Sequence, residues 1–342
     1  MPTVSPRVVV ADDSALMRRI VTNSLTRAGV DVVGAAADGD QALALCEREH
    51  PDAMTLDLAM PGLDGLGVLR RLKAKGGKRL PVVVVSAFSP SQGARAVDAL
   101  AEGAFDLVPK PTIGESLDEF TENLVSKVRL AADASAVHTT NGAHVARPRP
   151  VRRTGLARAV VIATSTGGPR ALAALLPKLP ARLGAGTLIV QHMPPGFTGS
   201  LAARLDRSSD ITVREAASGD SLDPGTALLA PGGHHLRVAS DGRMSLTDEP
   251  EIGGLRPRAD LTIKDAASVW GDRTLLVVLT GMGNDGLVGA TEIQRRGGRI
   301  LAEAETSCTV YGMPRAIVEA KLANDVLPLD ELADAIRSEA GS

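Results

Sequence analysis

Aromatic side chains are scarce in this sequence: only 2% of its 342 residues are Phe, Trp or Tyr. Because proteins bind single-stranded nucleic acid largely by stacking bases on aromatic rings, such a platform is not expected. Charges of opposite sign nearly cancel, leaving a net charge of −2. This balance gives no overall attraction to nucleic acid or to an anionic membrane surface. We expect neither nucleic acid nor a membrane as a direct binding partner.

Cysteines and long apolar runs are also few. The two cysteines, Cys46 and Cys308, lie in opposite halves of the chain and read as reduced, unpaired thiols. The opening residues MPTVSPRVVVADDS contain no signal-peptide core, and no later run has the length of a membrane span. With 44% hydrophobic residues and a length that suits about two domains, the sequence predicts a cytoplasmic globular protein.

Segments typical of strands and of helices alternate through the first 130 residues. Apolar, β-branched runs occupy residues 7–13, 30–36, 53–60, 80–87 and 105–111, and a stretch with helical spacing follows each one. The succession predicts five βα units, and therefore a doubly wound parallel sheet with helices on both faces. We assign this domain to residues 5–130 and expect its last helix to end near residue 132.

Residues 131–156 have no hydrophobic periodicity and are rich in small and polar residues. We interpret this segment as an interdomain linker. Its basic cluster, Arg147, Arg149, Arg152 and Arg153, would suit a phosphate, although a solvated linker is the favoured interpretation.

Residues 157–342 return to the α/β pattern with different loops. Strands are expected at residues 157–164, 187–193, 273–280 and 299–306, and helices at 169–179 and 198–208. Residues 211–247 are rich in Gly, Pro and Asp, and short antiparallel ribbons are expected there. The sequence thus predicts a second doubly wound α/β domain.

Polar residues end four of the five strands in the first domain. Asp12 and Asp13 follow the first strand, Asp57 the third, Ser86 the fourth and Lys110 the fifth. Ligands of parallel α/β sheets bind at this edge, so we expect these side chains to converge. Clustered carboxylates repel one another unless a cation lies among them, and Mg²⁺ prefers oxygen ligands. A carboxylate in such a site can take up a phosphoryl group.

The stretch AVVIATSTGGPRAL places Ser165 between an apolar strand and a glycine turn. Backbone N–H groups at the start of a helix favour negative charge, so this serine suits a nucleophile near an oxyanion site. A phosphate-binding turn and an N-capping serine remain alternatives at this point.

A nucleophilic serine needs a base and an orienting acid. His192 ends the strand expected to lie beside that of Ser165, whereas His234 and His235 are competitors on a ribbon. Asp285, in the glycine-rich loop LTGMGNDG, is the candidate acid, and it could also cap the next helix.

Asp12-Asp13, DLAMPGLDG, Ser86 and VPKP together resemble the receiver domain of bacterial response regulators. The resemblance implies a flavodoxin-like fold. It implies that Asp57 is the phospho-acceptor, that Asp12, Asp13 and Asp57 bind Mg²⁺, and that Ser86 and Lys110 are the switch hydroxyl and the phosphate-pairing lysine.

The motifs TSTGG, QHMPPGFT, APGGHHL, RPRADL and LTGMGNDG resemble those of the chemotaxis protein-glutamate methylesterase family, and with the receiver the likeness covers nearly the whole chain. It implies a Rossmann-like hydrolytic domain in which Ser165 is the nucleophile, His192 the base and Asp285 the orienting acid. It also implies that the Met282 N–H stabilises the oxyanion and that Thr166 gives polar support.

The resemblance further implies a carboxylic ester hydrolase, activated by phosphorylation, that demethylates glutamate methyl esters of chemoreceptors during chemotactic adaptation. Deamidation of receptor glutamines is implied as well. Receptors would be substrates and a histidine kinase the phosphodonor, with no cofactor for the esterase step. Two alternatives are a phosphorylation-controlled binding module with an inactive hydrolase fold, which the intact candidate triad disfavours, and a methylesterase of another signalling array.

Overall fold

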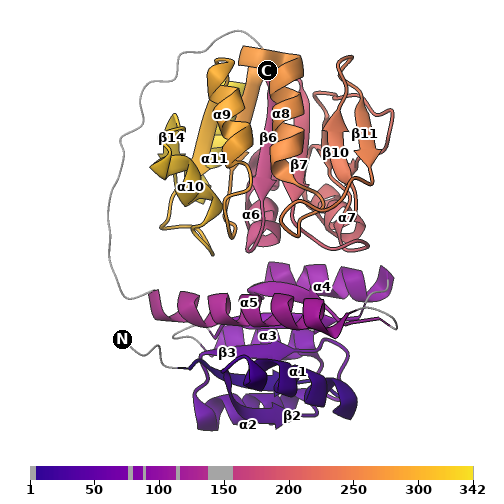
Figure 1. Cartoon of the computed structure of the whole chain (residues 1–342), viewed down its shortest axis with the longest axis vertical. Coiled ribbons are helices and arrows are strands. Elements are labelled where there is room, and N and C mark those ends of the chain that lie inside the picture. Colours follow the sequence, from indigo (N-terminus) through magenta and orange to yellow (C-terminus); the bar gives the residue numbers. More distant parts are fainter. Residues whose placement is uncertain (1–4, 76–79, 88–89, 113–115, 138–156, 342) are drawn as a thin grey trace. The chain divides into compact units, whose positions relative to one another are not determined.

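The computed structural model describes residues 5–75, 80–87, 90–112, 116–137 and 157–341 (Figure 1). The chain divides into two compact units, Met1–Asn141 and Gly142–Ser342. From residue 138 on, the predicted linker with its basic cluster lies outside the described residues. No helix in the described segments is both long and apolar enough to cross a membrane.

The first unit is a five-stranded parallel sheet in the order β2-β1-β3-β4-β5, as the succession of βα units predicted. This is the flavodoxin-like order. The strands are β1 (Arg7–Ala11), β2 (Asp31–Ala36), β3 (Ala53–Leu56), β4 (Val82–Ser86) and β5 (Asp106–Pro109). The helices are α1 (Ala15–Arg27), α2 (Gly39–Glu49), α3 (Gly65–Ala74), α4 (Pro90–Glu102) and α5 (Leu117–Val137).

Short polar side chains begin three of these helices. Ser14, Asp38 and Asp64 each accept a hydrogen bond from a backbone N–H in the first turn of α1, α2 and α3. At the other end of the unit, α5 runs to Val137, beyond the expected end near residue 132. Ala131 and Ala132 are buried, so the helix is packed up to its expected end, and the last turn continues past it through Asp133, which is exposed.

The second unit contains a seven-stranded sheet in the order β14-β13-β12-β6-β7-β9-β8, with every pair parallel. Its strands are β6 (Ala159–Thr164), β7 (Gly186–Gln191), β8 (Thr212–Glu215), β9 (Thr226–Leu229), β12 (Thr274–Val278), β13 (Arg299–Glu303) and β14 (Asp325–Leu327). A separate antiparallel hairpin comprises β10 (His235–Val238) and β11 (Met244–Thr247).

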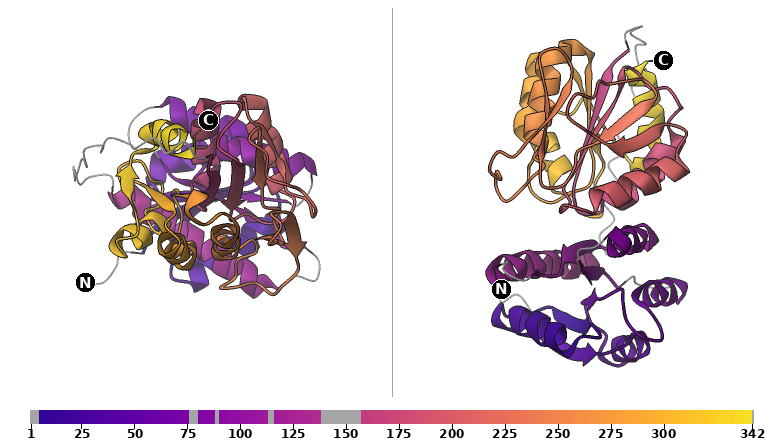
Figure 2. Two further views of the ribbon diagram at one scale, coloured as in Figure 1. Left: turned by 90° about the horizontal axis from the view of Figure 1, so that it is seen from above. Right: turned by 90° about the vertical axis from the view of Figure 1, so that its right-hand side faces the viewer.

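Helices cover both faces of this sheet. They are α6 (Gly168–Leu175), α7 (Thr198–Ser208), α8 (Ala259–Trp270), α9 (Leu287–Arg295), α10 (Met313–Glu319) and α11 (Leu329–Ala340), with short 3-10 turns η1 (Leu176–Lys178) and η2 (Gly271–Arg273). In Figure 2 (right) the orange helices α8 and α9 lie on one side of the strands and the yellow α11 on the other. Val161 and Leu276 of the sheet share a buried core with Ile263 of α8 and Ala290 of α9.

The expectation of antiparallel ribbons across residues 211–247 is wrong for its first half. β8 and β9 join the main sheet in parallel, and only β10 and β11 pair antiparallel. Leu228 of β9 pairs with Leu188 of β7 and is fully buried, so this short strand is part of the sheet's core. Strands of four residues show too little of a pattern to reveal their pairing partner.

The two ends of the second unit meet. The Arg158 N–H donates to the carbonyl of Ala340 over 2.8 Å. The guanidinium of Arg158 lies 2.7 Å from a carboxylate oxygen of Glu339, and Arg299 binds the other oxygen at 2.9 Å. Arg158 and Glu339 are both buried. The start of β6 and the end of α11 are therefore held together by a paired buried charge, which would be strongly destabilising if only one partner remained.

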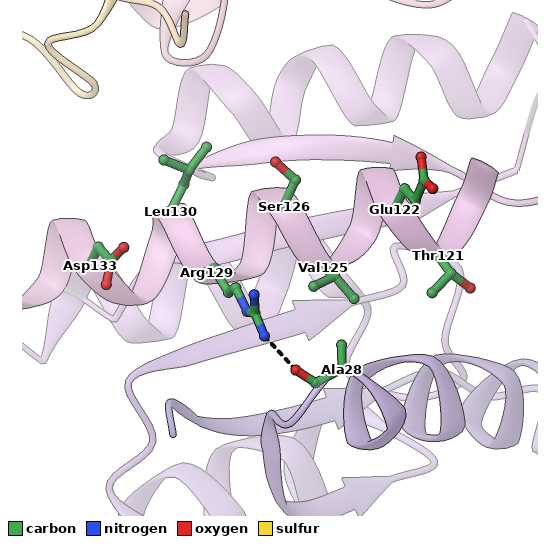
Figure 3. Close-up of a pocket in the computed structure, with 8 residues that line it drawn as sticks. All are labelled: Ala28, Thr121, Glu122, Val125, Ser126, Arg129, Leu130 and Asp133. Atoms are coloured by element: carbon green, nitrogen blue, oxygen red, sulfur yellow. Dashed lines mark hydrogen bonds between the residues drawn. The ribbon is translucent and has the colours of Figure 1, made fainter. Parts of the chain in front are cut away.

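A cavity of about 510 Å³ lies on the first unit along α5, beside the end of α1. In Figure 3 the Arg129 side chain reaches across it and donates a hydrogen bond to the carbonyl of Ala28. None of its lining residues is a predicted site residue. The cavity therefore carries none of the chemistry that the sequence predicts.

Candidate functional site

The predicted acidic residues of the first unit converge at the carboxyl edge of its sheet. Carboxylate oxygens of Asp12, Asp13 and Asp57 all lie within 4.8 Å of one another. Asp12 and Asp57 are buried, whereas Asp13 is exposed. An oxygen-only donor set with one open side fits Mg²⁺, which keeps several water ligands in most protein sites.

Lys110 supplies positive charge to this cluster. Its Nζ lies 2.7 Å from Asp57 Oδ2 and 2.8 Å from Asp12 Oδ2. Burial acts to lower the pKa of Lys110, but its hydrogen bonds to Asp12 and Asp57 outweigh that effect, and the pKa is raised. Burial raises the pKa of Asp12, although the same lysine opposes the rise. The ammonium thus stabilises a group of carboxylates that would otherwise repel one another.

Ser86 ends β4 next to this cluster, and its backbone carbonyl accepts a hydrogen bond from the Lys110 N–H over 2.8 Å. The Ser86 side chain is fully buried, and its Oγ has no hydrogen-bond partner. A buried hydroxyl without a partner is costly, so this group is suited to bind an oxygen that arrives at the site.

In the second unit, Ser165 is the first residue after β6. Its N–H donates to the Thr280 carbonyl over 3.1 Å, and its own carbonyl accepts from the Gly168 N–H over 2.8 Å. Gly167 adopts a φ of +81°, and a Cβ there would lie 2.5 Å from Thr309, so the turn requires glycine. Gly167 occupies the N-cap position of α6 and no side chain caps this helix, so Ser165 is not an N-cap.

His192 is the first residue after β7, the strand beside β6. The two strands pair through Thr164 and Gln191, and the His192 N–H donates to the Thr164 carbonyl over 3.1 Å. Ser165 and His192 are therefore neighbours across the end of two parallel strands, as expected. Among the described residues no hydrogen bond joins Ser165 to His192 directly, which is common in sites without substrate.

Asp285 lies beside His192, with 2.7 Å between Asp285 Oδ2 and His192 Nε2. The carboxylate also accepts hydrogen bonds from the N–H groups of Ala259 (2.7 Å) and Asp260 (2.9 Å), at the start of α8. Burial acts to raise the pKa of Asp285, but the hydrogen bond and charge of His192 and these N–H groups lower it to about 2. Asp285 is thus a buried, ionised partner for the imidazole.

Two residues around Asp285 were not among the predicted site residues. Arg258 Nε lies 2.8 Å from Asp285 Oδ1, as an ion pair without good hydrogen-bond direction. Asp260 accepts hydrogen bonds from the N–H groups of Gly286 (3.0 Å) and Gly289 (2.8 Å). Burial raises the pKa of Asp260. Both residues lie in RPRADL, so that motif was the available signal for them.

The competing histidines have other partners. His234 is exposed at its side chain and pairs with Asp248 at 2.6 Å. His235 is fully buried, and its Nδ1 accepts from the Arg258 N–H while its Nε2 lies 3.2 Å from the Pro250 carbonyl. Both of its ring nitrogens are engaged. The structure brings His192, and neither of these, to Asp285.

The loop after β12 lies against Ser165. A Cβ on Gly281 would come within 2.8 Å of Ser165 Cβ, so this contact requires glycine. Met282 follows and is 46% exposed, whereas Thr166 is buried. Thr280 links these segments because its Oγ1 donates to the Thr166 carbonyl over 2.9 Å.

Glu303 is another residue that sequence reasoning missed. It ends β13, is fully buried and accepts the Thr280 N–H over 2.8 Å and the Ser307 hydroxyl over 2.9 Å. Burial raises the pKa of Glu303. It supports the loop that packs on Ser165, and a glutamate inside the apolar part of an expected strand was the available signal.

Comparison with known proteins covers both units. The family model described as CheB methylesterase matches residues 160–336, and the model described as response regulator receiver domain matches residues 8–122. The solved CheB methylesterase catalytic domain of Thermotoga maritima is 42% identical, with a TM-score of 0.51, and the match covers 53% of this chain and 97% of that one.

Relatives also match over the full length. The protein-glutamate methylesterase/protein-glutamine glutaminase of Symbiobacterium thermophilum is 43% identical, over 98% of this chain and 97% of its own. A protein of the same description from Myxococcus xanthus, numbered 5, is 44% identical over 98% and 99% of the two chains. The chain therefore belongs to the CheB methylesterase family and begins with a response regulator receiver domain.

Proposed function

We propose that this protein is a phosphorylation-regulated carboxylic ester hydrolase, which demethylates glutamate methyl esters of chemoreceptors and deamidates receptor glutamines. Family membership supports this activity. The observation that supports its assignment to a site is the 2.7 Å contact between His192 and Asp285. His192 directly follows β7, and β7 pairs with β6, the strand that Ser165 directly follows. A buried carboxylate that orients an imidazole beside a serine is the arrangement that acyl transfer requires.

In the proposed reaction Ser165 Oγ attacks the ester carbonyl carbon. Since Nε2 of His192 bonds to Asp285, Nδ1 is the nitrogen left to take the Ser165 proton. The tetrahedral intermediate collapses, and the imidazolium returns the proton to methoxide, so methanol leaves. A water molecule then attacks the acyl-enzyme with the same imidazole as base, giving glutamate and free Ser165.

Two features stabilise charge during these steps. The ionised Asp285 lies against the imidazolium that forms when the proton moves. We assign the oxyanion to the Met282 N–H, with Thr166 as polar support, because the loop carrying Met282 packs on Ser165 through Gly281. Neither assignment invokes a cofactor.

In the receiver we propose Asp57 as the phospho-acceptor, with Asp12, Asp13 and Asp57 as Mg²⁺ ligands. Bound Mg²⁺ would neutralise the charge that carboxylates and phosphoryl oxygens bring together. Lys110, already bonded to Asp57, would pair with the phosphoryl group. The buried Ser86 hydroxyl has no hydrogen-bond partner and would donate to the phosphoryl group, which supports Ser86 as the proposed switch residue.

We further propose a cytoplasmic protein that acts on methyl-accepting chemoreceptors and takes phosphate from a chemotaxis histidine kinase. The proposed domain bounds are residues 5–130 for the receiver, 131–156 for the linker and 157–342 for the esterase, with the end of α5 contributing the first linker residues.

The decisive experiment measures methanol release from methylated receptor by the full chain, with and without a small-molecule phosphodonor. Release that rises with the phosphodonor supports the proposal. Absence of release, together with no labelling of Ser165 by a fluorophosphonate, would favour a binding module with an inactive hydrolase fold.

A further inference from the structure

Gln191 connects the nucleophile and the base through a single side chain. It is the last residue of β7 and is 2% exposed. Its Nε2 donates to the backbone carbonyl of Ser165 over 3.0 Å and to that of His192 over 2.9 Å. One buried amide therefore bonds to the main chain of both residues.

The orientation of this amide follows from chemistry. Two carbonyl oxygens face the amide nitrogen, and a flipped amide would place Oε1 against both of them. Oε1 itself is buried without a hydrogen-bond partner. A Cβ on Gly168 would come within 2.0 Å of Oε1, so the start of α6 leaves room for the amide only because residue 168 is glycine. In this orientation Gln191 Oε1 has no hydrogen-bond partner, whereas Nε2 donates both of its hydrogen bonds.

The amide also lies where the backbone ladder stops. The His192 N–H to Thr164 carbonyl bond, at 3.1 Å, is the last backbone bond between the ends of β6 and β7. Beyond it the chains turn away, Ser165 toward α6 and His192 toward α7. The two hydrogen bonds that Gln191 Nε2 donates connect the next residue of each chain, Ser165 and His192, beyond the last backbone bond. They limit how far the Ser165 turn can move from His192.

We propose that Gln191 is a positioning residue, which holds Ser165 and His192 at the separation needed for proton transfer from Ser165 Oγ to the imidazole. It acts through the two main chains and touches neither substrate nor reacting atoms. The inference rests on the proposed esterase function. A misplacement of about 1 Å in such a site lowers the rate by about 10²-fold.

The test replaces Gln191 by Met, which keeps the length of the side chain and removes both donors. We expect Gln191→Met to lower kcat for methanol release by about 10- to 100-fold, while KM stays within about twofold because substrate contacts are unchanged. Gln294→Met is the matched control, since Gln294 is exposed on α9. The control should retain wild-type kinetics.

A fluorophosphonate separates positioning from folding. The rate of Ser165 labelling should fall with kcat, while the final stoichiometry stays at one label per chain. Gln191→Glu is a second variant of the same size, in which an acceptor replaces the donor, and its labelling rate should fall at least as far.

Two results would overturn the proposal. The first is that kcat per folded chain and the labelling rate stay within about twofold of wild type in both variants. The second is that the label stoichiometry falls while the labelling rate is unchanged, because this would indicate a purely structural role for Gln191. A wild-type chain that labels at Ser165 but releases no methanol would instead refute the proposed function.

Discussion

Asp260 and Asp285 accept hydrogen bonds across the start of two neighbouring helices. Asp285 precedes Gly286, the N-cap of α9, and accepts its N–H, yet the Asp285 carboxylate also accepts the N–H groups of Ala259 and Asp260 at the start of α8. Asp260 lies in the first turn of α8, yet its carboxylate accepts the N–H groups of Gly286 and Gly289 at the start of α9. Figure 1 shows these two helices side by side. The exchange fixes the carboxylate that is hydrogen-bonded to His192 without requiring any contact from substrate.

The first prediction concerns Asp285→Asn, which should remain folded and lose about 10⁴-fold in kcat because the imidazole loses its orienting charge. Methanol release per folded chain measures the loss. Asp265→Asn offers a control, since Asp265 binds Arg237 on the hairpin side of α8. An Asp285→Asn variant with kcat within tenfold of wild type would refute the assignment.

The low pKa of Asp285 also predicts a pH dependence of stability. Because the folded pKa, about 2, lies below the reference value of 3.8, the carboxylate stabilises the fold above pH 4 and this contribution is lost as the pH falls toward 2. The shift corresponds to about 2 kcal/mol. The difference in unfolding free energy between wild type and Asp285→Asn should shrink by that amount from pH 5 to pH 2. Urea unfolding followed by fluorescence of Trp270, the single tryptophan, measures it.

Ser165→Ala should abolish methanol release while leaving the fold and the phosphorylation of Asp57 intact, since the covalent step has no other nucleophile. Ser240→Ala, at an exposed position beside the β10–β11 turn, is the matched control. More than a trace of activity in Ser165→Ala would exclude this serine as the nucleophile.

The three histidines of the second unit should respond differently. His192→Ala should abolish activity and also lower the unfolding free energy, because it removes a hydrogen-bond partner of the buried Asp285 carboxylate. His234→Ala should be near wild type because its pair with Asp248 is exposed. His235→Ala should lower the unfolding free energy by about 1–3 kcal/mol, because it leaves buried polar groups unpaired. Kinetics and thermal unfolding of all three distinguish the roles, and equal losses of kcat in His192→Ala and His234→Ala would mean that the base is wrongly assigned.

Asp57 should take up a phosphoryl group from a small-molecule donor in Mg²⁺, and Asp57→Asn should not. EDTA should suppress this uptake while basal methanol release persists, because the proposed metal ligands all belong to the receiver. Mass spectrometry locates the phosphoryl group, and its detection on another residue of the wild type would overturn the receiver assignment.

A receiver that restrains the esterase until it is phosphorylated predicts a rank order of activities. A fragment of residues 152–342 should release methanol faster than the unphosphorylated full chain, and phosphorylation should bring the full chain toward the fragment. The matched Thermotoga maritima structure is a catalytic domain alone, which supports a fragment of this kind. A folded fragment that is slower than the unphosphorylated chain would leave recruitment as the receiver's role.

The sequence predicted the two parallel sheets well because their central strands are continuous apolar runs. Val82–Ser86 and Ala159–Thr164 are buried at every residue. An apolar run of this kind is typical of an interior strand of a parallel sheet, because both faces of such a strand are covered by helices. The prediction failed at β8 and β9, where four residues carry too little pattern to choose between a hairpin and the main sheet. The end of α5 was placed too early because residues 133–137 carry no hydrophobic periodicity from which a helix could be predicted.

The same contrast holds for the site. The position of a residue directly after a strand was enough to bring Asp12, Asp57 and Lys110 together, and to bring His192 beside Ser165. The roles of Gln191 and Glu303 could not be inferred, because each depends on backbone groups of distant segments that only the folded chain brings within reach. Their side chains bond to N–H or carbonyl groups, which no sequence pattern identifies.

The meeting of Arg158 with Ala340 has a consequence for how such a protein can be rearranged. In this unit the first strand starts where the last helix ends. Another domain could therefore be attached at either terminus and would leave the unit from nearly the same place on its surface. The unit should also tolerate circular permutation, with residues 158 and 340 linked by a short glycine-rich peptide and new ends opened in an exposed turn such as that at Asp241. The esterase fold itself would therefore permit a receiver domain at either its N-terminus or its C-terminus.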